Sequence, residues 1–340
     1  MVADFTLTIG FAKHGLVADA AVNHVGRLAV LPLEPLAQST EGTATIATPA
    51  SLARLLRHRD FDIHKGTCGR VGIIAGSMGM SGAAILCAEG ALRGGAGLVT
   101  LYVPHAVHRI VAARAAPEVM VRAIDSPLEA LDAPHDVLAI GPGLGRDHAG
   151  SVRELIVRSP MPTVLDADAL NILAESLDLL DRCAGLRLLT PHPGEMARLD
   201  PGARTRSRRE TVEAWTARFP HTLLLKGART VVGERGRPLS YNSTGHPGMA
   251  SGGMGDVLTG LVSALIGQGL ALYHAAQAGS WLTGRAAELA IFEGPESAES
   301  LRATACTSAA TSPRRSCVPK AGGSGWAAWW TQPWNSRWRS

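Results

Sequence analysis

The segment NSTGHPGMASGGMGDVLTGLVSALIGQG, residues 242–269, decides the fold of this chain. Its first half is polar and rich in glycine, and its second half repeats apolar residues at the spacing of a helix that ends near Gly269. Gly252, Gly253 and Gly255 allow the backbone to adopt positive φ and to approach a ligand closely. Because free N–H groups and the positive end of the helix dipole meet at such a turn, the pattern predicts an anion-binding site.

Asp256 lies inside this turn, and its carboxylate admits two interpretations. An acidic residue at the start of a helix often serves as an N-terminal cap. A carboxylate beside an anion site would, however, repel the ligand unless it took part in the chemistry. We therefore favour Asp256 as a catalytic base and keep the helix cap as the alternative.

Short apolar runs alternate with helical segments upstream of the turn, and their composition is typical of strands buried on both faces. This alternation predicts an α/β fold with a central, mostly parallel sheet, whose ligands bind at the carboxyl ends of the strands. Leu98–Val103 is one such run and is closed by Pro104. Five others are followed at or near their carboxyl ends by Gly, Asp, His or Lys: Val71–Ala75, Asp136–Ile140, Thr163–Leu165, Leu186–Leu189 and Thr222–Leu225.

The glycine loop after the first strand, GSMGMSG at residues 76–82, matches neither common nucleotide-binding motif. Its glycines lack the G-x-G-x-x-G spacing of dinucleotide sites, and it has no Lys-Ser/Thr pair for a P-loop. Two interpretations remain open. The loop is either a close crossing of strand and helix or part of a ligand site that Ala83 also lines.

The composition narrows the class of protein further. A chain of 340 residues with 46% hydrophobic residues and 38 glycines is typical of a globular protein with many tight turns. The net charge of +4 is spread out except at Arg204, Arg206, Arg208 and Arg209, which we interpret as a solvated loop, so no nucleic-acid partner is expected. Five cysteines without metal or disulfide spacing, and no recognisable leader or membrane span, predict a cytoplasmic protein.

The chain divides into four parts by composition. Residues 1–36 contain two strand-like runs, Phe5–Ile9 and Arg27–Leu31, and residues 37–51 read as a polar linker that leads to a short helix at Ser51–His58. The main domain is predicted over residues 52–302 and ends with a helix at Ala275–Phe292. Residues 303–340 hold five of the seven tryptophans without periodicity, so we expect a disordered tail.

Seven segments, in order, resemble the NAD(P)H-hydrate dehydratase family of nucleotide-dependent repair enzymes. They are HKGTCGRVGIIAGSMGMSGAA, GALRGGAGLVTLYVP, IGPGLG, VLDADALNIL, LTPHPGEMARL, LLKGARTVV and TGHPGMASGGMGDVLTGL. The resemblance implies a ribokinase-like, three-layer α/β/α fold. Residues 3–33 resemble the closing strands of the epimerase domain that precedes the dehydratase in bifunctional bacterial enzymes. Because the catalytic part of that domain is missing, we expect no epimerase activity.

The resemblance also implies a reaction. Family members dehydrate the S-form of hydrated NADH or NADPH, and the bacterial character of this chain favours ADP, cleaved to AMP and phosphate, over ATP. Mg²⁺ and a homo-oligomer, commonly a tetramer, are implied as well. Two alternatives remain: a ribokinase-like kinase of the hydroxymethylpyrimidine or thiazole type, and an inactive nucleotide-binding remnant.

Individual positions carry over from the family by their place in these segments. Asp256 corresponds to the general base, and Gly253, Met254 and Gly255 to the anion hole. Glu195 corresponds to an acidic residue that organises Mg²⁺ through water, although a simple helix-start glutamate is an alternative. The adenine nucleotide is expected at Lys226, Gly227, Ala228, Arg229, Thr230 and Gly255, and the hydrated cofactor at Ala83, Gly143, His192 and Asp256.

Several of these positions keep a second interpretation. His192 is either a hydrogen-bond donor to the cofactor or a structural loop residue, and Lys226 is either a phosphate contact or merely exposed. Asp166 and Asp168 are expected to position Asn171. His246 stands where the family usually has asparagine, a change from which we expect modest consequences.

Overall fold

The computed structural model describes residues 2–31, 33, 44–56 and 59–293. The predicted tail at 303–340, the end of the predicted main domain after residue 293 and the first half of the predicted linker lie outside these residues. Among the helices in these ranges, none has the length and apolar character needed to cross a bilayer.

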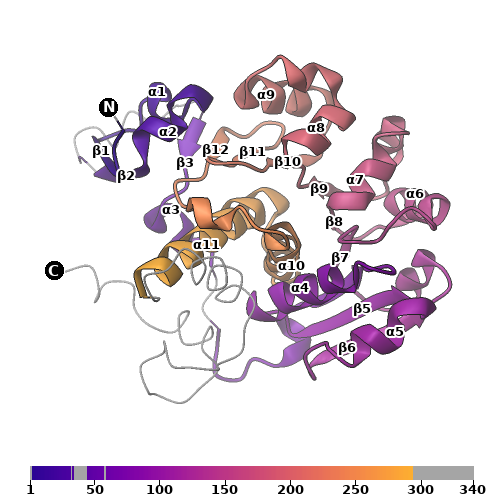
Figure 1. Ribbon diagram of the computed structural model, residues 1–340. Helices are drawn as coiled ribbons and strands as arrows, with labels where there is room; N and C mark the ends of the chain where they lie inside the picture. The colour runs from indigo at the N-terminus through magenta and orange to yellow at the C-terminus, as the bar shows by residue number, and fades with distance from the viewer. Residues whose placement is uncertain (1, 32, 34–43, 57–58, 294–340) are drawn as a thin grey trace.

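The first described part, residues 2–31, forms a small unit that we call the N-terminal unit (Figure 1). Its strands β1 (Phe5–Ile9) and β2 (Arg27–Leu31) have the predicted bounds and pair in parallel. Three short helical segments connect them: α1 (His14–Val17), η1 (Asp19–Ala21) and α2 (Val22–Val25).

The remaining strands form one sheet of ten, in the order β3-β12-β11-β10-β9-β8-β7-β4-β5-β6. β11 is antiparallel to both of its neighbours, and the other neighbouring strands pair in parallel, as predicted for a mostly parallel sheet. The strands are β3 (Ala44–Ile46), β4 (Arg70–Ile74), β5 (Leu98–Pro104), β6 (Val119–Ile124), β7 (Val137–Ile140), β8 (Thr163–Leu165), β9 (Arg187–Leu189), β10 (Thr222–Leu225), β11 (Val231–Gly233) and β12 (Leu239–Tyr241).

Two layers of helices cover the sheet and make the α/β/α arrangement (Figure 1). On one face the core includes side chains of α3 (Pro49–Ala53), α4 (Ser81–Arg93), α5 (His105–Ala112), α10 (Met254–Gly267) and α11 (Leu272–Glu293). On the other face it includes those of α6 (Ala149–Arg158), α7 (Ala167–Leu173), α8 (Pro193–Leu199) and α9 (Arg208–Arg218). Alternate residues of a strand point to opposite faces, so Ile73 belongs to the first core and Ile74 to the second.

The structure differs from the sequence prediction at the start of the main domain. Residues 44–46, expected in a linker, form β3 and pair with β12. The following helix starts at Pro49 rather than Ser51 because Thr48 and Ser51 form a capping box around its first turn.

The sheet has a switch point between β4 and β7. From β4 the chain adds β5 and β6 on one side, and then returns to add β7, β8, β9 and β10 on the other. The connections after β4 and β7 therefore leave in opposite directions, and in open α/β sheets the ligand crevice lies at such a switch point, at the carboxyl ends of the strands. This crevice is where the α/β fold positions a ligand.

Helices α4 and α10 cross at very short distance because glycines face each other's backbone. A Cβ on Gly260 would lie 1.9 Å from the carbonyl oxygen of Cys87, and one on Gly90 would lie 2.4 Å from that of Val257. No side chain fits in either place, since both obstacles are backbone atoms. The crossing sets the position of the first turn of α10 over the sheet.

We expect Gly260→Ala to lower the free energy of unfolding by about 3 kcal/mol, because the added methyl group forces the two helices apart. Gly150→Ala is the matched control: Gly150 lies in α6, and a Cβ there has nothing within 4 Å. The control should be neutral or stabilise by about 0.5–1 kcal/mol. Urea unfolding of both variants measures the difference, and equal stabilities would contradict the prediction.

Candidate active site

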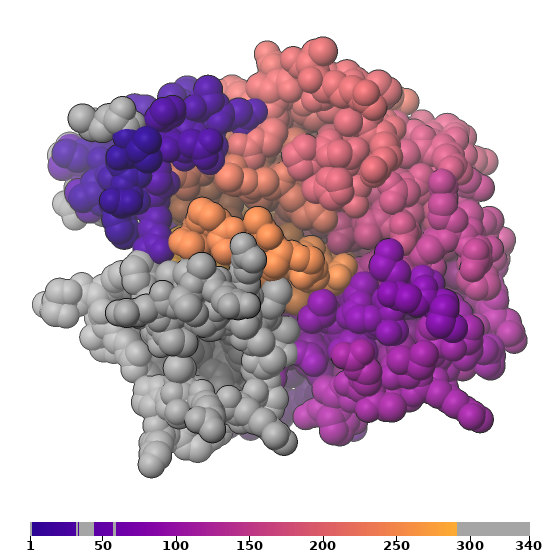
Figure 2. Space-filling view, viewed as in Figure 1, coloured from indigo at the N-terminus to yellow at the C-terminus, as the bar shows by residue number. Residues whose placement is uncertain are grey.

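The first turn of α10 places Asp256 at the carboxyl edge of the sheet. Gly253 is the N-cap of this helix with a φ of 94°, so the turn requires the left-handed conformation that glycine adopts readily. Asp256 is the third residue of the helix, and no side chain caps this end. Figure 2 shows the orange segment that includes the loop before α10 at the molecular surface. The amides of a helix start and a carboxylate thus share one partly exposed turn.

A buried carboxylate, Asp166, connects three elements beneath this turn. It follows β8 and is 1% exposed. Its Oδ1 lies 2.7 Å from Lys226 Nζ at the end of β10, and its Oδ2 accepts a hydrogen bond of 2.8 Å from the hydroxyl of Thr259 in α10. Asp166 therefore fixes the position of α10 relative to two strand ends.

The prediction that both Asp166 and Asp168 position Asn171 is wrong for Asp166. In the structure Asp168 accepts the hydrogen bond from Asn171 Nδ2, at 3.3 Å, and a second one from the amide of Gly145, at 2.8 Å. Thr259 was missed altogether, since a threonine inside an apolar helix gives no signal in the sequence. The lysine at a neighbouring strand end was the available signal for the partner of Asp166.

The surroundings of Asp256 raise the pKa of its carboxyl group to about 7. Burial is the largest cause, the negative charges of Asp166 and Glu195 act in the same direction, and the ammonium of Lys226 opposes them. A carboxyl group with a pKa near neutrality is suited to exchange a proton with a substrate hydroxyl. This is the chemistry that the site offers.

Lys226 is enclosed by carboxylates. Burial by itself lowers its pKa, but the charges of Asp166, Glu195 and Asp256 outweigh burial, so its net pKa is raised and the ammonium is retained. Its Nζ lies 3.8 Å from Glu195 Oε2, and a Cβ on Gly255 would lie 3.3 Å from the same Nζ. The absence of a side chain at Gly255 therefore leaves the ammonium adjacent to the anion-binding turn.

His192 and Glu195 form a reciprocal cap at the start of α8. Nδ1 of His192 accepts from the amides of Gly194, at 3.0 Å, and Glu195, at 3.4 Å, and Glu195 Oε2 accepts from the amide of His192 at 2.8 Å. Because Nδ1 is an acceptor, the neutral imidazole carries its proton on Nε2 and can donate it. The exposed ring is thus a structural cap, and its Nε2 lies 3.5 Å from Glu195 Oε1.

Ala83 and Gly143 meet at the switch point. The loops after β4 and β7 are joined by hydrogen bonds from the Gly76 amide to Pro142 O, at 2.9 Å, and from Ser77 Oγ to Gly143 O, at 2.8 Å. A Cβ on Gly143 would lie 2.9 Å from that of Ala83, and the φ of Gly143 is 57°. Close packing therefore explains Gly76, where a Cβ would lie 3.0 Å from that of Ala84, but not Gly79 and Gly82, where a Cβ would have nothing within 4 Å.

The five residues from Lys226 to Thr230, which we call the nucleotide segment, point in different directions. Lys226 faces Asp166, Gly227 and Ala228 are exposed, and Arg229 is 8% exposed. The Arg229 guanidinium donates to the carbonyls of Gly26 and Ser243. A ligand would therefore meet the backbone of this segment rather than the Arg229 side chain.

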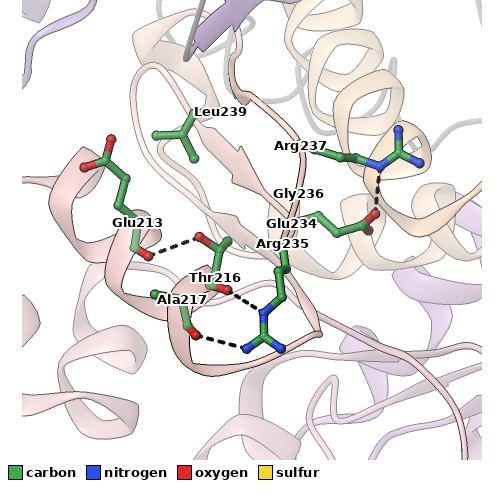
Figure 3. Close-up of a pocket in the computed structure, with 8 residues that line it drawn as sticks. All are labelled: Glu213, Thr216, Ala217, Glu234, Arg235, Gly236, Arg237 and Leu239. Atoms are coloured by element: carbon green, nitrogen blue, oxygen red, sulfur yellow. Dashed lines mark hydrogen bonds and ion pairs between the residues drawn. The ribbon is translucent and has the colours of Figure 1, made fainter.

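A shallow depression lies at the opposite edge of the sheet (Figure 3). Its volume is about 330 Å³, and its lining comes from the end of α9 and the turn between β11 and β12. In the turn, Arg235 donates to the carbonyls of Thr216 and Ala217, at 3.1 and 3.0 Å, and so satisfies the end of α9. Leu223 pairs with Gly233 beside this depression, so the depression lies where the parallel strands begin. Asp256 lies at the opposite, carboxyl ends of the strands and is therefore remote from it.

Metal ligands are sparse in the described ranges. There, no group of three or more His, Cys, Asp or Glu side chains could hold a metal ion. Glu195 is 6% exposed and its Oε2 accepts the hydrogen bond that caps α8, so Oε1 is the oxygen through which it could face a metal or its water. Only a metal held mainly by phosphates and water, as Mg²⁺ commonly is, fits beside this carboxylate.

The sheet order, the crevice and a glycine turn opening a helix define a ribokinase-like protein. Two solved structures share this fold: a ribokinase-like superfamily protein from Enterococcus faecalis (TM-score 0.66, 23% identity, 78% of this chain and 95% of that chain), and an ADP/ATP-dependent NAD(P)H-hydrate dehydratase from Bacillus subtilis co-crystallised with ATP and Mg²⁺ (TM-score 0.64, 28% identity, 77% of this chain and 96% of that chain).

Sequence comparison then identifies the family. The profile of the NAD(P)H-hydrate dehydratase family matches residues 71–305. An ADP-dependent (S)-NAD(P)H-hydrate dehydratase from Neisseria meningitidis is 36% identical over 251 residues, 72% of this chain and 84% of that protein. The chain belongs to the NAD(P)H-hydrate dehydratase family, as its motifs predicted.

Longer relatives also match. A bifunctional NAD(P)H-hydrate repair enzyme from Moorella thermoacetica is 41% identical over 305 residues, which are 84% of this chain. This chain spans 58% of the length of that relative and 61% of a second one, from Coxiella burnetii.

Proposed function

We propose that this chain dehydrates the S-form of hydrated NADH or NADPH and couples the reaction to cleavage of ADP into AMP and phosphate. The observation that carries the proposal is the position of Asp256, a carboxylate with a pKa of about 7 in the anion-binding turn of α10. The names of the relatives from Neisseria meningitidis and Bacillus subtilis support ADP, or ATP, as the phosphoryl donor.

The chemistry follows from the poor leaving ability of a hydroxyl group. Asp256 takes the proton of the 6-hydroxyl while the hydroxyl oxygen attacks the terminal phosphorus of ADP, and AMP departs. The phosphate ester then leaves as inorganic phosphate as a proton is lost from C5, which restores the ring double bond. Amides of Gly253, Met254 and Gly255, with the dipole of α10, stabilise charge on the transferred phosphoryl group.

Other residues hold the reactants in place. The Lys226 ammonium, next to Gly255, attracts the phosphates, and the exposed backbone at Gly227 and Ala228 borders the adenine nucleotide. Ala83, Gly143 and the Nε2–H of His192 contact the hydrated nicotinamide. Mg²⁺ would be held by the phosphates and by water hydrogen-bonded near Glu195, where it would neutralise phosphate charge.

The proposal extends to the rest of the chain. The N-terminal unit corresponds to the end of an epimerase domain, and the dehydratase domain, predicted to begin at residue 52, also includes β3 at residues 44–46. The reactants are small molecules, and the working protein is a cytoplasmic homo-oligomer. Support comes from the match to bifunctional relatives, which includes most of this chain.

The test is the recovery of NADH absorbance from hydrated NADH by the purified chain with Mg²⁺ and either ADP or ATP. We expect a rise that requires nucleotide and releases one inorganic phosphate per NADH. A phosphorylated product without released phosphate would instead identify a small-molecule kinase. Absence of a rise, together with a nucleotide-dependent increase in Tm, would identify a binding protein without turnover.

A further inference from the structure

Arg208, the first residue of α9, binds the backbone of the nucleotide segment. Its Nη1 donates to the carbonyl oxygens of both Ala228 and Arg229, the second at 3.1 Å. The Arg208 side chain is only 15% exposed, so the prediction of a solvated loop is wrong for this residue. A Cβ on Gly227 would lie 2.7 Å from the same Nη1, so the segment packs closely against the guanidinium.

The N-terminal unit in turn holds Arg208. Asp19, at the start of η1, accepts from Arg208 Nε at 2.6 Å and from the Arg208 amide at 3.0 Å. One oxygen of the Asp19 carboxylate pairs with the guanidinium and the other with the amide of the same residue, so Asp19 holds the side chain and the backbone of Arg208 together. Figure 2 shows the indigo N-terminal unit against the salmon surface that includes α9.

A second connection reaches the same segment. Arg229 has a φ of 64°, a conformation that non-glycine residues adopt rarely. Its buried guanidinium donates to Gly26 O, in the N-terminal unit, and to Ser243 O, at 3.2 Å, in the loop before α10. Two arginines thus link one short segment to the N-terminal unit, although that unit contributes no residue to the candidate active site.

We propose that the N-terminal unit positions the nucleotide segment for ADP: Asp19 orients Arg208, and Arg208 fixes the backbone of Ala228 and Arg229. This inference rests on the proposed function for the identity of the ligand. Fixing a backbone segment before binding removes an ordering cost that the ligand would otherwise meet. Asp19 and Arg208 are positioning residues, so their loss should weaken nucleotide binding and leave the chemical step intact.

The experiment is titration calorimetry with ADP and Mg²⁺ on the full chain and on Asp19→Ala, Arg208→Ala and the double variant. We expect each single variant to raise the Kd and KM for ADP about 5- to 20-fold, with kcat within about twofold of wild type. The Kd of the double variant for ADP should be no higher than that of the single variant with the higher Kd, because both substitutions remove the same interaction. Arg208→Lys should not restore affinity, since an ammonium cannot bridge in the same geometry.

Arg209→Ala is the matched control. Arg209 also reaches the N-terminal unit, through His14 Nδ1 at 3.0 Å, and pairs with Glu213 of its own helix. We expect its Kd for ADP to stay within about twofold of wild type. If Arg208→Ala does not fold, amide exchange at residues 227–230 in Asp19→Ala and Arg208→Lys replaces it, with faster exchange expected.

The outcomes separate this inference from the proposed function. Wild-type affinity in Asp19→Ala, unchanged amide exchange, or a fall in kcat at unchanged Kd would overturn the positioning role. Failure of the wild-type chain itself to bind ADP would overturn the proposed function and this inference with it. Weakened binding in Asp19→Ala and Arg208→Ala, with Arg209→Ala unaffected, would support the positioning role.

Discussion

Asp256→Asn is expected to reduce turnover of hydrated NADH by about 10²- to 10⁴-fold, the usual contribution of a positioned general base. Asparagine keeps the size of the side chain but cannot take a proton. ADP affinity should be retained or slightly improved, because the variant removes a negative charge beside the anion-binding turn. Steady-state rates and calorimetric Kd values for ADP, measured on the same preparations, check both parts.

The pH dependence follows from the same carboxyl group. A base is active when deprotonated, so kcat/KM should rise with pH up to about 7, the pKa of Asp256, and then level off. A profile that is flat from about pH 5 to pH 8 would contradict the assignment. It would mean that the proton goes to another group.

The free energy of unfolding should fall with rising pH in the wild type. Asp256→Asn, which lacks the base, should not lose this stability. The raised pKa makes the charged form costly in the folded state; this cost is absent below the ordinary pKa of 3.8, grows as pH rises toward about 7 and is complete above it. Asp256→Asn should therefore be more stable than wild type at about pH 8, by about 1–2 kcal/mol once partial solvent exposure is allowed for, and equal at about pH 4.

Asp166→Ala is expected to lower the free energy of unfolding by about 3–5 kcal/mol, because it leaves the largely buried Lys226 ammonium without its nearest partner and Thr259 without its acceptor. Turnover should fall as well, since Asp166 sets the position of α10. Asp168→Ala is the matched control in the same segment, and we expect about 1 kcal/mol from its lost hydrogen bonds. Denaturant unfolding of both variants gives the comparison.

A double variant distinguishes an unpaired charge from general damage. Lys226→Met removes the charge that Asp166→Ala leaves behind, so the combination should recover part of the lost stability. Additive losses in the double variant would show that the Asp166–Lys226 pair is not the cause. The double variant should remain inactive, because Lys226 is proposed to attract the phosphates.

Long or strongly apolar elements were predictable from the sequence. β8 and β10 have the predicted bounds, and α10 ends at Gly267, close to the end predicted near Gly269. β11 and β12 were missed because no α-helix separates them from β10, so they lie outside the alternation of strand and helix from which β8 was predicted. β3 was missed because a polar segment becomes a strand only by pairing with β12, which is a tertiary effect.

The site was predictable as a location more than as a set of contacts. Because each strand ends in a polar residue or glycine, the sequence indicates that Asp166, Glu195, Lys226 and Asp256 share one edge of the sheet, and the structure brings them together. Which carboxylate pairs with Lys226 depends on the sheet order and on side-chain directions, neither of which a linear pattern contains. The catalytic and binding roles of these residues remain predictions.

The pairing of β3 with β12 has a consequence for biosynthesis. The hydroxyl of Thr45 in β3 lies 3.4 Å from the carbonyl of Leu239, a residue 194 positions later in the chain. At a translation rate of about 5–20 residues per second, the ribosome delivers β12 about 10–40 s after β3. The nascent chain must hold β3 unpaired for that time and then close a long loop. We expect the sheet to grow from its central strands outward and to complete this edge among the last events of folding.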